Sequence, residues 1–320
     1  MKALKIAKRT KVEDLRLSEV AKPSPKPGWI LIKNIAFGLN HAEVIFRAQE
    51  IGSPKFPEPR IIGIECVGIV EDGGETDLEP GTRVIALMGG MGRSFDGSYA
   101  EYVLVPRKNV FRAQSTLDSA HLAAVPETFF TAWGSLFECL QLKAGDRLMI
   151  RGATSALGQT AILIGKTIGA RIIATARNNA KEKLLKSLGV DEIIVDPAGS
   201  LESIDYCEKA DKILDLIGAA SMKDSLKFLN PGGIVCVTGT LGGKFREEIN
   251  PINDIPNGCY LTGFYSNYPT QEKVDEILNF IDLHHIVPPI GKIYNFEDVT
   301  EYSRDLEEGK IGGKGVVIIR

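Results

Sequence analysis

From about residue 147 onward, short apolar segments alternate with segments of helical character, and this alternation limits the possible folds more than any other feature. The apolar segments read RLMI, RIIAT, EIIV, KILDLI and GIVCVTG, and stretches such as AKEKLLKSL and SMKDSLKFL separate them. Strands alternating with helices of this length predict a parallel sheet with right-handed crossover connections. We therefore expect an α/β domain over residues 118–284, built on a doubly wound parallel sheet.

The residues before this domain have a different character. Turn-forming stretches such as PSPKPG, GSPKFPEP and GGMGRSFDGS divide runs such as WILIKNIAF and RVIAL. This pattern predicts short strands, and hence a β-rich domain over residues 1–117. The last stretch, residues 285–320, has strand, helix, strand character, and we expect it to return to the first domain. A chain of 320 residues is long enough for two such domains.

Composition excludes several classes of protein. The chain is 44% apolar and 25% charged with a formal net charge of -3, which is typical of a soluble globular protein. Lysine and arginine are dispersed, so no nucleic-acid partner is expected. Lysines interrupt the N-terminal MKALKIAKRT, which predicts neither a signal peptide nor a membrane span. The five cysteines never form a C-x-x-C pair, which indicates reduced thiols and a cytoplasmic location; they are Cys66, Cys139, Cys207, Cys236 and Cys259.

The stretch RGATSALGQ, residues 151–159, follows a predicted strand and opens a predicted helix. In the dinucleotide-binding pattern G-x-G-x-x-G, the three glycine positions fall on Ala153, Ser155 and Gly158, so only the third glycine is kept. Gly158 retains the close helix-to-strand packing, and the two small residues still allow backbone amides to approach a phosphate. The Ser155 hydroxyl can donate a hydrogen bond, and the helix N-terminus favours an anion.

Two interpretations of this stretch remain, a coenzyme loop or a plain strand-to-helix turn. Its place inside a complete βαβ unit favours the coenzyme loop. The candidate contacts are Thr154, Ser155, Ala156 and Leu157.

The residues after the second α/β strand bear on the choice of coenzyme. An acidic residue about 20 positions after the loop would bind a ribose 2′-hydroxyl and indicate NAD. This chain has TARNN there, and Arg177 and Lys181 offer cations to a 2′-phosphate instead. NADPH is the predicted coenzyme; the alternative is that both cations are ordinary surface charges.

Several segments together resemble one known family. They are GLNHAEVIFR (38–47), GIECVGIV (63–70), PGTRVIAL, DGSYAEYVLVP (96–106), AAVPETFFTAW (123–133), LKAGDRLMIRGATSALG, ILDLIGAASMKDSLKFLNPGGIVCVTG and LEEGKIGGKGVVII. In this order the chain resembles, over nearly its whole length, the zinc-free quinone oxidoreductase branch of the medium-chain dehydrogenase/reductase superfamily. The resemblance implies a GroES-like β domain completed by the C-terminal segment, a Rossmann domain, and a coenzyme cleft at their junction.

The resemblance also bears on metal binding. Zinc members hold their catalytic metal through a Cys, a His and a third ligand, and the corresponding positions here are Asn40, Ile64 and Glu127. One carboxylate cannot supply the three protein ligands that a catalytic zinc needs. We expect no metal.

Catalytic candidates come from the same resemblance. Asn40 has the position beside the nicotinamide and the substrate, so it is interpreted as a positioning donor, and the neighbouring His41 as a proton relay. The alternatives are an Asn in a polar turn and a hydrogen-bonded structural His. Thr131 matches a residue that faces the nicotinamide carboxamide in relatives; its alternative is a buried helical threonine.

Three further coenzyme candidates follow the fifth strand of the predicted parallel sheet. Ligands bind at the carboxyl ends of such strands. Gly239, Thr240 and Leu241, in TGTLGG, are therefore expected to line the coenzyme site.

These features lead to a prediction of the chemistry. Without a Lewis acid, acceptors that delocalise the incoming charge, such as quinones and α,β-unsaturated carbonyls, are easier to reduce than simple ketones. We therefore expect an NADPH-dependent, metal-free reductase of quinones or other conjugated carbonyls. Ile45 stands where quinone reductases of this branch often have an aromatic residue, which keeps open an enal or enone reductase with little quinone activity. A non-catalytic NADPH-binding or sensing protein is the third alternative.

Residues 257–269 predict a homodimer through sheet extension.

Overall fold

The computed structural model describes residues 1–206 and 208–320, so Cys207 lies outside the described residues. The chain divides into two compact units. Unit 1 comprises Met1–Phe130 and Ser266–Arg320, and unit 2 comprises Thr131–Tyr265. The expected domain boundaries near residues 117 and 284 do not coincide with the limits of these compact units.

Unit 1 is built on a seven-stranded sheet in which β16, β17, β4, β6, β7 and β9 follow one another and β8 also pairs with β4. These strands are β4 (Trp29–Gly38), β6 (Glu65–Asp72), β7 (Arg83–Leu87), β8 (Tyr102–Pro106), β9 (Val110–Arg112), β16 (Ile290–Asn295) and β17 (Lys314–Ile318). Two small two-stranded sheets accompany it: β1 (Lys2–Ala3) with β3 (Ser18–Glu19), and β2 (Lys5–Ile6) with β5 (Arg60–Ile61).

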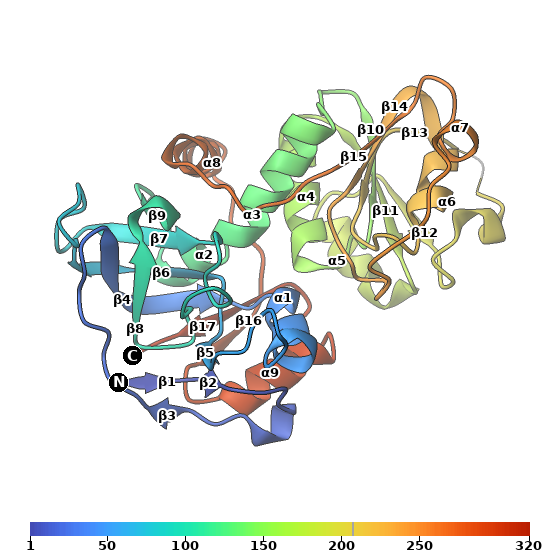
Figure 1. The fold of residues 1–320 in the computed structure, drawn as a ribbon. Helices are drawn as coiled ribbons and strands as arrows, with labels where there is room; N and C mark the ends of the chain where they lie inside the picture. Colours follow the sequence, from blue (N-terminus) through green and yellow to red (C-terminus); the bar gives the residue numbers. More distant parts are fainter. Residues whose placement is uncertain (207) are drawn as a thin grey trace. The chain divides into compact units, whose positions relative to one another are not determined.

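The C-terminal strand β17 lies against β4, although almost 280 residues separate them in sequence. The pairing is antiparallel and aligns Val316 with Gly38, and Figure 1 shows the red β17 beside the blue β4. This register brings the start of β17 close to the end of β4. Apolar residues of these strands are buried together with an aromatic cluster that contains Phe37, Tyr99 and Tyr302.

The helices of unit 1 are mostly short, and among them α2 packs on β4 and β6 of the sheet. They are η1 (Val12–Asp14), α1 (His41–Ile45), η2 (Phe46–Glu50), η3 (Arg107–Asn109), α2 (Ser119–Ala123), α8 (Gln271–Leu283) and α9 (Val299–Glu307). Helix α3 (Pro126–Trp133) contains the first boundary between the two units.

Helix α8 explains why the compact units differ from the expected domains. The Gln271 side chain accepts a hydrogen bond from the Arg112 backbone N–H at 2.8 Å and donates one to the Arg112 carbonyl at 3.1 Å. Val274, Ile277 and Leu278 lie against apolar residues of unit 1 such as Phe111. The helical pattern of α8 was visible in the sequence, but its packing partner was not.

Unit 2 contains a six-stranded sheet in the order β12-β11-β10-β13-β14-β15, and every neighbouring pair is parallel. The strands are β10 (Arg147–Arg151), β11 (Arg171–Ala176), β12 (Glu192–Val195), β13 (Ala210–Asp215), β14 (Leu229–Val237) and β15 (Tyr260–Gly263). The strand order reverses between β10 and β13, and ligands of open α/β sheets bind at such a switch point. This sheet confirms the predicted α/β fold.

The helices of unit 2 precede β10 or lie between successive strands of the sheet. They are η4 (Gly134–Cys139), α4 (Ala156–Thr167), η5 (Asn179–Lys181), α5 (Glu182–Ser187), η6 (Leu201–Ile204), α6 (Met222–Lys227) and α7 (Pro251–Asp254). Residues 148–151 of β10 are all buried, as expected for a parallel strand covered on both faces.

Candidate coenzyme and substrate site

The loops that follow β10, β13 and β14 are joined at the carboxyl end of the sheet in unit 2. The Leu216 N–H donates to the Arg151 carbonyl at 3.1 Å, and the Leu241 N–H donates to the Leu216 carbonyl at 3.1 Å. A side chain on Gly239 would collide with the Leu216 backbone. The structure thus brings the loop after β10 together with the predicted Gly239–Leu241 segment, through a β13 loop that sequence reasoning had not singled out.

The loop before α4 is closed by its own hydrogen bonds. Gly152 has a φ of 82°, a conformation that favours glycine. The Ser155 hydroxyl donates to the Gly152 carbonyl at 2.8 Å and accepts from the Gly158 N–H at 3.1 Å, so Ser155 caps the helix. The hydroxyl proton of Ser155 is therefore used within the loop. The sequence analysis had instead expected this proton to be donated to a phosphate.

The packing expected at Gly158 is present. A Cβ at this position would lie 2.6 Å from the Gly152 carbonyl oxygen. Ser155 caps the third helical N–H, and in an α-helix the first two, those of Ala156 and Leu157, have no intrahelical acceptor. These amides, with the positive end of the helix dipole, are the groups of this loop whose chemistry suits an anion. Thr154 is half-buried, and its carbonyl accepts a hydrogen bond from the Gln159 side chain at 3.0 Å.

The two predicted cations lie just after β11. Arg177 is exposed, and Lys181 is half-buried at the end of η5. In the part of the chain that the structure describes, neither forms a salt bridge with a carboxylate. Thr240 and Gly239 are half-buried and Leu241 is exposed, whereas Thr131 is buried within α3 and its carbonyl accepts from Ser135.

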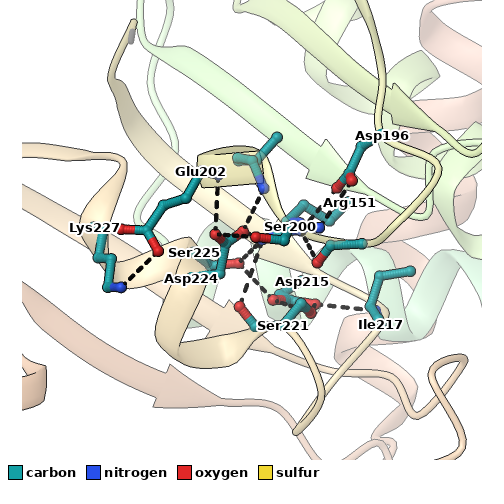
Figure 2. Close-up of polar contacts among 12 residues, drawn as sticks. Arg151, Asp196, Ser200, Glu202, Asp215, Ile217, Ser221, Asp224, Ser225 and Lys227 are labelled. Carbon is teal, nitrogen blue, oxygen red and sulfur yellow. Dashed lines mark hydrogen bonds and ion pairs between the residues drawn. The ribbon is translucent and has the colours of Figure 1, made fainter. Parts of the chain in front are cut away.

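A buried arginine beside this loop was missed by sequence reasoning. Arg151, the last residue of β10, is completely buried and forms ion pairs with Asp196 and Asp224. Figure 2 shows these residues with Ser200, Ser225 and other polar neighbours. The available signal was a charged residue at the end of a strand whose other inward positions are apolar.

In unit 1, Asn40 belongs to a buried network of charges. The Lys314 ammonium donates to Asn40 Oδ1 at 2.7 Å and to Glu65 Oε1 at 2.6 Å. Asn40 Nδ2 donates to Glu65 Oε1 at 2.7 Å, and the Asn40 backbone N–H donates to Glu43 Oε2 at 2.5 Å. Lys314 is 2% exposed and Glu65 is 0% exposed. Gly38 is required here, because a Cβ would collide with the Glu65 and Lys314 side chains.

This network fixes the orientation of Asn40. Its second amide proton faces Gly38 O and Glu43 Oε1, both at 3.3 Å. The amide therefore already has partners within unit 1 for both its oxygen and its nitrogen. The role expected for Asn40, a positioning donor beside the nicotinamide and the substrate, stays a prediction, and the structure adds Lys314, Glu65 and Glu43 as residues that hold it.

Burial also changes the protonation of Glu43. Desolvation raises the pKa of its carboxyl to about 8, and the Lys314 ammonium opposes this rise. Burial likewise holds the pKa of the Tyr99 hydroxyl, which is hydrogen-bonded to Glu43, well above its usual value. The predicted proton relay, His41, is the first residue of α1 and is exposed. It takes no part in this network.

The described residues contain no group of three or more His, Cys, Asp or Glu side chains arranged to hold a metal ion. At the three positions compared with zinc ligands, Asn40 binds the Lys314 ammonium, Ile64 donates its N–H to Glu43 Oε1 at 3.3 Å, and Glu127 donates its N–H to Glu65 Oε2 at 2.7 Å. The four described cysteines are free thiols.

Comparison with known proteins shows which families have this architecture. Residues 26–115 match the family model described as alcohol dehydrogenase GroES-like domain, and residues 156–282 match the one described as zinc-binding dehydrogenase. The chain belongs to the medium-chain dehydrogenase/reductase superfamily. This superfamily, and a fold that combines a GroES-like domain with a Rossmann sheet, are as predicted from the sequence. None of the three positions compared with zinc ligands falls within residues 156–282.

Similar superfamily members cover the whole chain. The quinone oxidoreductase of Sus scrofa is 26% identical over 335 residues, which span 100% of this chain and 97% of the relative. A solved NAD-dependent alcohol dehydrogenase is 27% identical, with a TM-score of 0.83 and full coverage of both chains. A mycobacterial protein solved in complex with NADPH has the same fold, with a TM-score of 0.85, 24% identity and coverage of 99% of this chain and 100% of that chain. No helix among the described residues is long and apolar enough to span a membrane.

Proposed function

We propose that this superfamily member is an NADPH-dependent, metal-free reductase of quinones or other conjugated carbonyl compounds. The observation that supports the proposal is the structure of the N-terminus of α4. Two uncapped amides, a helix dipole and a glycine at closest packing lie at the switch point of a six-stranded parallel sheet. The coenzyme would supply the hydride, while the protein orients it and excludes water.

The choice of NADPH rests on Arg177 and Lys181. No acidic residue follows β11 at the place where a ribose 2′-hydroxyl would be bound, and both cations lack a salt-bridge partner among the described residues. The comparisons include both an NAD-dependent alcohol dehydrogenase and a protein of the same fold solved with NADPH, so a direct comparison of the two coenzymes is the decisive test. Fluorescence titration should give tighter binding of NADPH than of NADH.

The Arg177→Gln variant tests the role of this cation. It should weaken NADPH binding about tenfold and leave NADH binding unchanged. Failure of the wild type to bind either coenzyme would refute the proposal.

The proposal of metal-free chemistry rests on the donor set. Asn40, Ile64 and Glu127 offer one carboxylate, and the Lys314 ammonium already interacts with Asn40. Conjugated acceptors suit such a site because the charge that follows hydride transfer is delocalised. Turnover should therefore persist after treatment with a chelator, and loss of activity that zinc restores would contradict the assignment.

The acceptor class can be tested with a panel of quinones, enones, enals and simple aldehydes. The quinone oxidoreductase relatives support quinones, whereas Ile45 favours the second candidate, an enal or enone reductase, because it offers no ring for stacking. The ratio of kcat/KM values for quinones and enones decides between them. NADPH binding without turnover of any acceptor would favour a coenzyme-sensing protein instead.

The residue roles follow from the same proposal. Asn40, held by Lys314 and Glu65, would keep its carboxamide in one orientation toward the reacting groups, and His41 would relay a proton to the reduced product. His41→Gln should lower kcat by about 10²-fold and leave the dissociation constant of NADPH unchanged. Gly239, Thr240, Leu241 and Thr131 are proposed to line the coenzyme site.

We further propose a cytoplasmic homodimer. Strand β15 is the edge strand of the sheet in unit 2, and it carries Tyr260, which is 60% exposed. An unpaired edge with exposed aromatic residues can pair with a second copy of itself.

A further inference from the structure

Arg151 is the centre of a buried polar network in unit 2. Its guanidinium donates from Nη2 to Asp196 Oδ2 at 3.0 Å and to the Gly199 carbonyl at 2.7 Å. From Nη1 it donates to Asp224 Oδ2 at 2.5 Å and to Ser225 Oγ at 3.0 Å. One side chain therefore binds the loop after β12 and the helix α6 at the same time (Figure 2).

The aspartates around Arg151 also bind the backbone of these loops. Asp196 Oδ1 accepts from the Ser200 N–H at 2.8 Å, and Asp224 Oδ2 accepts from the Leu201 N–H at 3.0 Å. Asp215, at the end of β13, accepts from the Gly218 N–H at 2.9 Å and from Ser225 Oγ at 2.6 Å. Asp196 and Asp224 thus both order the loop after β12, Asp215 orders the loop after β13, and the network joins the two loops.

A network of this kind is costly unless its geometry is good. The Arg151 guanidinium pairs with the carboxylates of Asp196 and Asp224 and is linked to that of Asp215 through the Ser225 hydroxyl. Arg151, Asp196 and Asp215 are almost completely buried. Such charges stabilise a fold less than apolar packing of similar volume would, and they are best understood as fixing one arrangement. The arrangement fixed here is that of the loops after β12 and β13 relative to β10.

The location of the network links it to the coenzyme. Arg151 immediately precedes the loop that begins with Gly152, and its carbonyl accepts from Leu216 of the β13 loop. The strand order reverses between β10 and β13. In a sheet of this topology the adenosine half of a dinucleotide lies on the β11 and β12 side of that reversal. The loop held by Arg151 begins at Asp196, whose N–H donates to the carbonyl of Ala176, the last residue of β11, at 2.8 Å. This loop would therefore border the adenosine half, whereas hydride transfer would take place at the other end of the coenzyme.

We propose that Arg151 is a positioning residue for the adenosine half of the coenzyme. By clamping residues 196–200 to α6 it keeps the wall of this half in its binding geometry, so that it sets coenzyme affinity and not the chemical step. This inference rests on the proposed function, because it presupposes that a nicotinamide dinucleotide binds at this crevice.

Two substitutions test the inference by different routes. Arg151→Lys keeps the charge but loses the planar fork that bridges two aspartates, and Asp196→Asn keeps Arg151 but weakens its hold on the loop. The matched control is Arg147→Lys, the same substitution at the other end of β10, where the arginine is partly exposed and paired with Glu208. NADPH affinity is measured by fluorescence titration, kcat at saturating NADPH, and amide hydrogen exchange over residues 197–204.

We expect both test variants to raise the dissociation constant of NADPH about tenfold, to keep kcat within about twofold, and to exchange faster over residues 197–204. The control should change none of these. A folded variant that binds NADPH like the wild type overturns the role of Arg151, as does an equal loss of kcat and affinity. If Arg151→Lys does not fold, Asp196→Asn decides by the same criteria. A wild type that binds no dinucleotide removes the proposed function and this inference together, whereas normal wild-type binding with unaffected variants removes only the inference.

Discussion

At the scale of single residues, the least expected feature is the group of buried ionisable side chains in unit 1. Sequence reasoning singled out Asn40, but not the three charged residues that surround it. Lys314, Glu65 and Glu43 are each buried, and each comes from a different element. Burial of an ion is tolerated only with a partner in good geometry. Removal of one member should therefore leave another buried and unpaired, which destabilises the fold.

Replacement of Lys314 should therefore destabilise unit 1. Lys314→Met leaves the Glu65 carboxylate buried without its cation, and we expect a loss of about 3–5 kcal/mol in the free energy of unfolding. Urea unfolding followed by Trp29 fluorescence, in a Trp133→Phe background, measures this unit. Lys292→Met is the control, because Lys292 is an exposed lysine that also has two carboxylate partners. Equal effects of the two substitutions would contradict the role of burial.

Glu43 should make stability depend on pH. Its pKa is raised from 4.5 to about 8 by burial, so between these values the folded chain retains a proton that the unfolded chain has released. Stability therefore falls as pH rises from about 4.5 to 8 and levels off above that. A tenfold difference in proton affinity between the folded and unfolded chain corresponds to about 1.4 kcal/mol.

The Glu43→Gln variant checks this expectation. It should lose most of that pH dependence and gain stability relative to the wild type as pH approaches 8. Urea unfolding at pH 5, 6.5 and 8 is the measurement, with the exposed Glu58→Gln as control. A wild type whose stability rises over this range, with no change in the slope on substitution, would refute the assignment.

At the scale of elements, the loop and helix α4 show how far a local pattern reaches. The sequence predicted a βα turn with Gly158 at its point of closest packing, and the structure places the backbone of Gly152 against it. The pattern did not predict that Ser155 caps the helix, or that the pairing of β14 with β13 is irregular. The stretch NPGG lies within β14, where the pairing register shifts.

Two glycines of α4 provide a matched comparison. Gly158→Ala would push a methyl group against the Gly152 backbone, whereas Gly165→Ala would meet mainly flexible side-chain ends such as the Ile172 Cδ1. We expect Gly158→Ala to cost about 1–3 kcal/mol and to weaken coenzyme binding, with a smaller effect on both from Gly165→Ala. Thermal unfolding and NADPH titration measure these effects. Indistinguishable variants would mean that the helix can shift away from the loop.

At the scale of the whole molecule, one of the two compact units is assembled from segments far apart in sequence. Unit 1 needs β17 and α8 from the C-terminal part of the chain. Unit 2 is continuous and ends at a sheet edge, β15. An exposed edge that is not blocked by charge or proline can pair with another edge.

The proposed homodimer can be tested at this edge. Tyr260→Lys places a charge on β15 and should shift the protein from dimer toward monomer, as measured by light scattering across a range of protein concentrations. Lys273→Glu, on α8 of unit 1, is a surface control of opposite charge change. A wild-type chain that remains monomeric at high concentration would contradict the dimer, as would a Tyr260→Lys variant that remains fully dimeric.

Local patterns in the sequence were sufficient to predict the fold class, the parallel sheet and the position of the loop before α4. The patterns are apolar runs at strand length, helical periodicity between them, and small residues at that loop. The packing of α8 against unit 1, the approach of Lys314 to Asn40, and the loops that Arg151 joins became known only from the folded chain. These contacts connect residues up to 274 positions apart, and they depend on strand register and on the desolvation of charged groups. No local pattern encodes either of these, since both arise only when distant segments pack together.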